Sequence, residues 1–199
     1  MNLPNLLTLG RILFVPVFVL VYVIPGERTY LLAATLFALA AFTDWLDGYL
    51  ARRLNQTTPF GAFLDPVADK LIVVTALVLL IGHHRTLWLT LPALVIVGRE
   101  IVISALREWM AEMNRRGVVA VSWLGRVKTT FQMIAVVVLL ANPPAFDRPW
   151  VLLGYGLLYV AAAMTLASMA LYLHAAWPTL KSGYGGPEGE PGEDPRDRS

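Results

Sequence analysis

Residues 44–69 read DWLDGYLARRLNQTTPFGAFLDPVAD and carry four aspartates, Asp44, Asp47, Asp65 and Asp69, between two strongly apolar stretches. Charged side chains at membrane depth are costly, and where they occur they usually serve a function. The first two aspartates are three residues apart and the last two are four apart, so on helices each pair shares a face. The segment therefore predicts two helix ends that present four carboxylates to one another.

Apolar runs of membrane length extend on both sides of this segment. Of the 199 residues, 57% are hydrophobic and 15% are charged, whereas soluble domains carry about a quarter charged residues. Six runs approach the roughly 20 residues that cross a bilayer; they cover about residues 6–24, 30–50, 66–81, 87–106, 123–141 and 150–173. We expect an all-α membrane protein with six transmembrane helices in a bundle, in preference to a soluble helical protein with an unusually apolar core.

The placement of Lys and Arg predicts the orientation. Connections after the first, third and fifth runs contain only Arg28, Arg85 and Arg148. The N-terminal region and the other two connections contain eight cations, which are Arg11, Arg52, Arg53, Arg107, Arg115, Arg116, Arg126 and Lys128. The positive-inside rule then places both termini in the cytoplasm. Residues 1–180 are the expected membrane domain, and residues 181–199, rich in Gly, Pro and charge, are an expected disordered cytoplasmic tail.

The four aspartates have the chemistry of a site for hard cations. The chain has no Cys, which excludes disulfides and thiolate zinc sites, and carboxylate oxygens favour Mg²⁺ or Mn²⁺. Two such ions would neutralise a diphosphate and help its leaving group depart. Arg52 would neutralise phosphate oxygens at the rim. Gly48 and Ala51 have almost no side chain, which leaves room for a ligand against the helix backbone.

Each of these residues also has a structural explanation. Asp65 precedes a proline, as an N-cap residue often does. Gly48 and Ala51 would suit a seam of small residues between packed helices, and Asp69 would pair locally with Lys70. Each explanation is reasonable for one residue taken alone. Together they do not explain why these residues recur at this fixed spacing over residues 44–69.

The pattern D-x2-D-G-x2-A-R-x8-G-x3-D-x3-D is filled without a departure by residues 44–69, and it resembles the signature of the CDP-alcohol phosphatidyltransferase family. The resemblance implies a six-helix membrane bundle, usually a homodimer. It implies that Asp44, Asp47, Asp65 and Asp69 bind two Mg²⁺ or Mn²⁺ ions, with Asp69 also the general base on the acceptor hydroxyl. The residues that it implies for binding the CDP-diacylglycerol donor are Gly48, Ala51, Arg52, Thr58 and Gly61.

A second polar stretch bears on the acceptor alcohol. Five polar residues form a stripe on the predicted helix over residues 87–106 and its continuation, namely Arg99, Glu100, Ser104, Arg107 and Glu108. Such a stripe normally faces a water-filled cavity. Arg107 and Lys128, together with Arg126, are predicted to bind the phosphate of a phosphorylated acceptor. Alternatively, Arg99 and Glu100, and likewise Arg107 and Glu108, are ion pairs that hold the bundle together.

Three further stretches, residues 2–11, 98–108 and 121–132, are similar to the branch of this family that forms phosphatidylglycerophosphate in bacteria. This resemblance implies transfer of a phosphatidyl group from CDP-diacylglycerol to sn-glycerol 3-phosphate with release of CMP. It also implies a bacterial cytoplasmic (inner) membrane location with the active site facing the cytoplasm, membrane lipid as a partner, and no nucleic acid. The signature itself leaves phosphatidylglycerol, inositol phosphate and serine open as acceptors. A divalent-cation transporter is a weaker alternative, because no internal repeat is visible.

Overall fold

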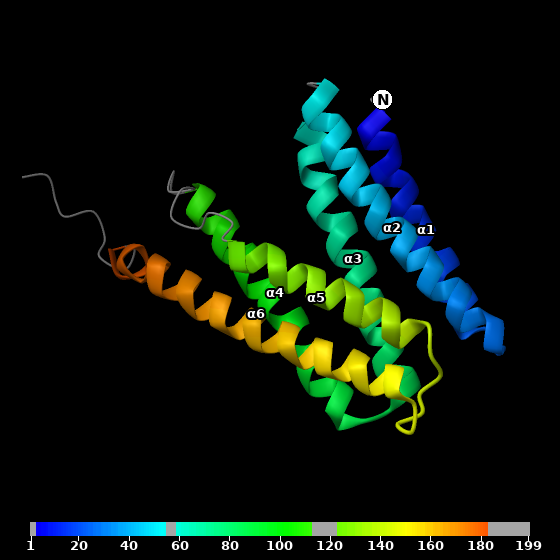
Figure 1. The fold of residues 1–199 in the computed structure, drawn as a ribbon. Coiled ribbons are helices and arrows are strands. Elements are labelled where there is room, and N and C mark those ends of the chain that lie inside the picture. The colour runs from blue at the N-terminus through cyan, green and yellow to red at the C-terminus, as the bar shows by residue number, and fades with distance from the viewer. Residues whose placement is uncertain (1–2, 55–58, 113–122, 183–199) are drawn as a thin grey trace, which may run out of the picture.

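The computed structural model describes residues 3–54, 59–112 and 123–182, and these form six α-helices and no strands (Figure 1). The helices are α1 (Leu3–Val23), α2 (Glu27–Leu54), α3 (Pro59–His84), α4 (Leu87–Glu112), α5 (Trp123–Leu140) and α6 (Pro149–Ser182). Each of the six apolar runs in the sequence corresponds to one of them. The predicted all-α fold is therefore confirmed.

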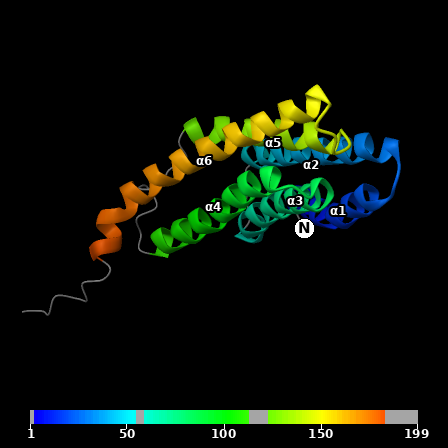
Figure 2. The same cartoon turned by 90° about the horizontal axis from the view of Figure 1, so that it is seen from below.

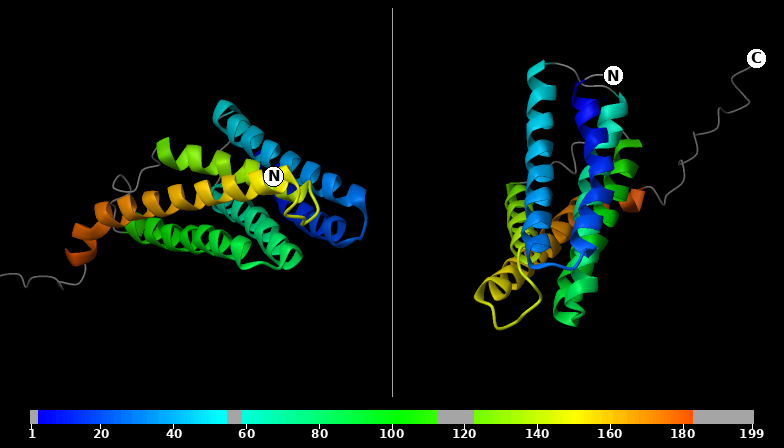
Figure 3. Two further views of the ribbon diagram at one scale, coloured as in Figure 1. Left: turned by 60° about the horizontal axis from the view of Figure 1, so that its bottom comes forward. Right: turned by 90° about the vertical axis from the view of Figure 1, so that its right-hand side faces the viewer.

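The helices pack in two groups that share a core. Helix α1 lies beside both α2 and α3, whereas α6 packs along α5 and α4 (Figure 1). Contacts of α5 with α2 and of α3 with α4 join the two groups. Figure 2 shows the C-terminal part of α6 continuing well past the start of α5. In the right-hand view of Figure 3, the start of α1, the end of α2 and the start of α3 lie at the same end of the bundle.

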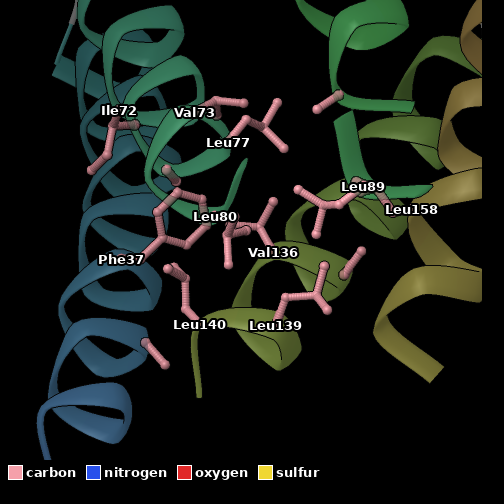
Figure 4. Close-up of a cluster of buried hydrophobic side chains, with 14 of the residues drawn as sticks. Phe37, Ile72, Val73, Leu77, Leu80, Leu89, Val136, Leu139, Leu140 and Leu158 are labelled. Atoms are coloured by element: carbon pink, nitrogen blue, oxygen red, sulfur yellow. The ribbon is translucent and has the colours of Figure 1, made fainter. Parts of the chain in front are cut away.

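Fully buried apolar side chains from five helices meet between the two groups (Figure 4). Phe37 of α2, Leu77 of α3, Leu89 of α4, Val136 of α5 and Leu158 of α6 all belong to this main core. A smaller cluster between α4 and α6 contains Ile103, Leu106, Met110, Tyr172 and Ala176. Lipid tails are as apolar as these side chains, so close packing holds membrane helices together more than a hydrophobic driving force does.

The outside of the bundle is apolar, as a lipid-facing surface should be. Within the described residues, three segments are long and apolar enough to cross a membrane, Pro66–His84, Leu87–Met110 and Pro149–Trp177. Shorter apolar segments lie in α1 and α5, at Thr8–Val23 and Val127–Leu140. The chain is accordingly a membrane protein, and the count of six spans stays a prediction.

Helices α3 and α6 extend furthest beyond the predicted apolar runs. Helix α3 begins at Pro59, so Asp65 lies inside the helix and does not cap its N-terminus. The N-cap explanation of Asp65 is therefore wrong. Helix α6 continues to Ser182, and residues 183–199, most of the predicted tail, lie outside the described residues.

Gly154 of α6 faces α5 where a larger residue does not fit. A Cβ atom at this position would lie 2.7 Å from both Cγ and Cδ2 of the buried Leu139. We expect Gly154→Ala to destabilise the bundle by about 1–3 kcal/mol through overpacking, measured as a lower midpoint of thermal unfolding in detergent. Gly156→Ala is the matched control, because its Cβ would meet nothing within 4 Å. Equal midpoints for the two variants would contradict the packing argument.

Candidate active site

A cavity of about 750 Å³ opens between α1, α2, α3, α4 and α5. Its polar wall combines residues from the two parts of the sequence that were singled out above. Asp44 and Asp69 contribute carboxylates, and the α4 stripe contributes Arg99, Glu100, Ser104, Arg107 and Glu108. The volume is within the range of small-molecule sites. The fold thus brings two predicted metal ligands into the same cavity as Arg107, which is predicted to bind the acceptor substrate.

Arg11 of α1 joins the two carboxylates. Its Nη1 atom donates to Oδ1 of Asp44 at 2.5 Å and to Oδ1 of Asp69 at 2.6 Å. The arginine side chain is only 2% exposed, whereas the aspartate side chains are 39% and 44% exposed. Hydrogen bonds between ionised groups are among the strongest in proteins. Because both oxygens contact the same nitrogen, the carboxylates of α2 and α3 must lie close together.

The other predicted donor-site residues are described only in part. Asp47 lies in α2 one turn after Asp44, and Asp65 lies in α3 one turn before Asp69. At these spacings, each pair of positions shares a helix face. The side chains of Asp47 and Asp65 lie outside the described part of the structure. The same holds for the side chains of Ala51 and Arg52 and for the surroundings of Gly48. Thr58 is outside the described residues altogether, whereas Gly61 is buried in α3.

The described donor atoms fit a hard divalent cation. Asp44 and Asp69 converge from two helices on one point and supply only carboxylate oxygens, which Mg²⁺ and Mn²⁺ prefer. Among the described side chains, no group of three His, Asp or Glu residues has the arrangement of a metal site. The four-aspartate metal site therefore stays a prediction, with two of its members in compatible positions.

Glu100 connects two nearly buried cations beside the carboxylates. Its Oε1 atom accepts from Nη1 of Arg99 at 2.7 Å and from Nζ of Lys128 at 3.1 Å. The Arg99 and Lys128 side chains are 6% and 4% exposed, and Nη2 of Arg99 also lies 3.5 Å from Oγ of Ser168. The Arg99–Glu100 ion pair that the sequence left open is thus present. The ammonium of Lys128, predicted to bind the acceptor, lies against Glu100.

Arg107 is exposed in the cavity and stacks on a buried aromatic ring. Its guanidinium carbon lies 5.7 Å from the ring centroid of Tyr172, and that of Arg99 lies 5.6 Å from the same centroid. These distances are within the range of cation–π interactions. Tyr172, which α6 contributes, therefore contacts two cations of the α4 stripe. Arg126 lies in α5, and its side chain is outside the described part of the chain.

Sequence reasoning missed Arg11 and Tyr172 as site residues. The sequence counts Arg11 as a cytoplasmic charge and as part of the stretch 2–11 that carries the resemblance, but it gives Arg11 no role in the site. Arg11 nevertheless lies inside the apolar run over residues 6–24, and a cation in such a run is itself a reason to expect function. Tyr172 gave no comparable indication. It is one aromatic residue among many in an apolar run, and only the packing of α6 on α4 brings it to the arginines.

Inside a membrane helix bundle, two carboxylates converge beside a row of cations, an arrangement suited to a phosphate-linked lipid. The chain belongs to the CDP-alcohol phosphatidyltransferase family, whose model matches residues 1–174. It is 61% identical over 184 residues to the CDP-diacylglycerol–glycerol-3-phosphate 3-phosphatidyltransferase of Pseudomonas fluorescens, covering 92% of this chain and 93% of the relative.

Two further relatives with the same name are those of Escherichia coli (strain K12) and Shigella flexneri. Each is 54% identical over 176 residues, which is 88% of this chain and 94% of the relative. These comparisons confirm the family that the aspartate pattern indicated.

Proposed function

We propose that this enzyme transfers a phosphatidyl group from CDP-diacylglycerol to sn-glycerol 3-phosphate, giving phosphatidylglycerophosphate and CMP. The observation that carries the proposal is the single cavity that holds Asp44 and Asp69 together with Arg107. One part of this wall suits a cation-bound diphosphate, and the other suits an anionic acceptor. The names of the relatives, which are similar over almost their whole length, support the same reaction.

The aspartates of α2 and α3 would hold the donor through divalent cations. When bound, two Mg²⁺ or Mn²⁺ ions would neutralise the diphosphate and the charge that develops on departing CMP. Asp44 and Asp69 offer carboxylate oxygens on both sides of the point where α2 and α3 approach one another. Asp47 and Asp65, on the same helix faces, would complete the ligand set. The acyl chains of the donor would remain in the bilayer.

Asp69 would act on the acceptor as general base. Its carboxylate is partly exposed in the cavity, so it can receive the proton of the 1-hydroxyl group of glycerol 3-phosphate. The freed oxygen then attacks the phosphatidyl phosphorus, and the bond from this phosphorus to the CMP oxygen breaks. Holding both substrates in one cavity makes this attack effectively unimolecular.

The cations of α4 and α5 would select a phosphorylated acceptor. Arg99, Glu100 and Lys128 together keep one net positive charge, and Arg107 adds an exposed guanidinium on the same wall. A fork of guanidinium donors matches phosphate oxygens, whereas an uncharged alcohol gains nothing from such cations. Arg107, with Lys128 and Arg126, is therefore our candidate for binding the acceptor phosphate.

The proposed setting is the bacterial cytoplasmic membrane, crossed six times, with the cavity facing the cytoplasm. Large exposed apolar side chains on α1 and α2, including Leu13, Leu20, Leu31 and Leu39, support lipid contact for helices outside the three longest apolar segments. Helix α2 has 28 residues, about 42 Å of helix, which is enough to cross. A homodimer is the proposed assembly, by analogy with the family.

The test is a product assay with purified protein, CDP-diacylglycerol and single acceptors. Mass spectrometry should detect phosphatidylglycerophosphate with glycerol 3-phosphate, and chelation of divalent cations should abolish it. Product with serine, inositol phosphate or phosphatidylglycerol, but not with glycerol 3-phosphate, would refute the acceptor. Flux of Mn²⁺ into proteoliposomes, without CMP release, would instead favour the transporter alternative.

Tyr172 should affect acceptor binding more than turnover. Its ring supports Arg107 and Arg99, and loss of a cation–π contact of about 1 kcal/mol corresponds to a roughly fivefold change. We expect Tyr172→Leu to raise the KM for glycerol 3-phosphate by about fivefold with a smaller change in kcat. Tyr172→Phe keeps the ring and is the matched control. A Tyr172→Leu variant with an unchanged KM would rule out this positioning role.

A further inference from the structure

We propose that Arg11 is a built-in counter-cation of the aspartate site, which moves away from Asp44 and Asp69 when a divalent cation binds there. The inference rests on the proposed function in one respect only, namely that these aspartates bind metal. It concerns what occupies the carboxylates before the metal does. Arg11 would thereby set how tightly the site binds its metal.

The guanidinium of Arg11 lies between the two carboxylates. A single nitrogen of Arg11 contacts one oxygen of each carboxylate, at 2.5 Å and 2.6 Å. This is where a cation shared by α2 and α3 would lie. The side chain reaches the point from a third helix, α1, and it is nearly excluded from solvent. Arg11 therefore has the geometry of a bridging ion.

Arg11 and the two carboxylates compensate one another's charge. Two carboxylates that converge without a cation between them repel one another. A buried guanidinium, in turn, is costly unless it has anionic partners. The contact between Arg11 and the two aspartates meets both needs at once. It offsets both the repulsion between the carboxylates and the cost of burying the guanidinium.

Arg11 and a divalent cation would compete for the same carboxylate oxygens. Mg²⁺ binds oxygens at about 2.0–2.1 Å in a nearly octahedral shell, so an ion bridging the same two oxygens would take the place of the Arg11 nitrogen. The positive charges of the guanidinium and of the divalent cation would also repel one another if both contacted the same oxygens. A divalent cation that takes up these two Oδ1 atoms must therefore displace Arg11 from at least one of them. The free energy of those contacts opposes metal binding, as for any two ligands that compete for one site.

The experiment measures Mn²⁺ binding by calorimetry to purified protein in detergent, without lipid substrate. Arg11→Gln should bind Mn²⁺ about tenfold more tightly than the wild type, a change typical of coupled equilibria. Without metal it should unfold at a lower temperature, and saturating Mn²⁺ should raise its midpoint more than that of the wild type. Arg28→Gln, an exposed arginine at the start of α2, is the matched control and should leave the affinity unchanged.

Arg11→Lys covers the case in which Arg11→Gln does not fold. It keeps the charge, but a compact, strongly hydrated ammonium bridges two carboxylates less well than a guanidinium does. This variant should also bind Mn²⁺ more tightly than the wild type. Equal or weaker binding in the folded variants would overturn the proposal, as would wild-type binding that Asp44→Asn leaves intact. Because no turnover is measured, the outcome is independent of whether glycerol 3-phosphate is the acceptor.

Discussion

Replacing Asp69 by asparagine is expected to slow formation of phosphatidylglycerophosphate by at least about a hundredfold, the lower end of what a general base contributes. The amide has the same shape as the carboxylate but cannot accept the proton of the attacking hydroxyl. It also removes a negative charge beside Arg11 and the proposed metal. The measurement is the rate of product release from CDP-diacylglycerol and glycerol 3-phosphate at saturating Mg²⁺.

Asp147→Asn provides the control for this substitution. It makes the same chemical change at an exposed position in the connection between α5 and α6, far along the chain from the site. Its turnover should match the wild type. An Asp69→Asn enzyme within tenfold of the wild type would contradict the general-base role. Thermal unfolding of the same preparation shows whether an inactive Asp69→Asn variant is still folded.

Replacing Glu100 by glutamine should destabilise the bundle by about 2–3 kcal/mol, at or below the lower end for breaking a buried ion pair, because this carboxylate is partly exposed. Two nearly buried cations, Arg99 and Lys128, depend on the charge of this one side chain. A neutral amide would leave them as uncompensated like charges. The expected result is a lower midpoint of thermal unfolding in detergent.

Glu108→Gln is the natural comparison for Glu100→Gln. Glu108 lines the same cavity two turns further along α4 and is exposed. Its loss should change stability little, as for most surface substitutions. Similar unfolding midpoints in the two variants would show that the Glu100 ion pairs contribute nothing measurable to the fold.

The sequence predicted the helices better than their ends. Apolar length marks where a chain crosses lipid, so the six runs located all six helices. It does not mark where a helix stops, because a helix can continue through residues such as Asp or Gly that interrupt an apolar run. Helix α3 therefore begins at Pro59, seven residues before the predicted run over residues 66–81, and places Asp65 inside the helix.

The site was predictable where its chemistry is local in sequence. The spacing of Asp44 with Asp47, and of Asp65 with Asp69, is a property of one helix each, and it can be read directly. Arg11 contacts residues 33 and 58 positions away, and no local pattern records such a pairing. For Glu100, the sequence offered an ion pair or a cavity wall as alternatives. The structure shows that it is both.

The reach of Arg11 across three helices has a consequence for how the chain is made. Ribosomes add about 5–20 residues per second, so the 58 positions that separate Arg11 from Asp69 take roughly 3–12 seconds to synthesise. Throughout that interval, the first helix carries a guanidinium whose second anionic partner does not yet exist. Stable burial of the first helix must wait for the third. The N-terminal helix therefore enters the membrane early but gains its final contacts only when α3 packs against it, and that packing also assembles the site.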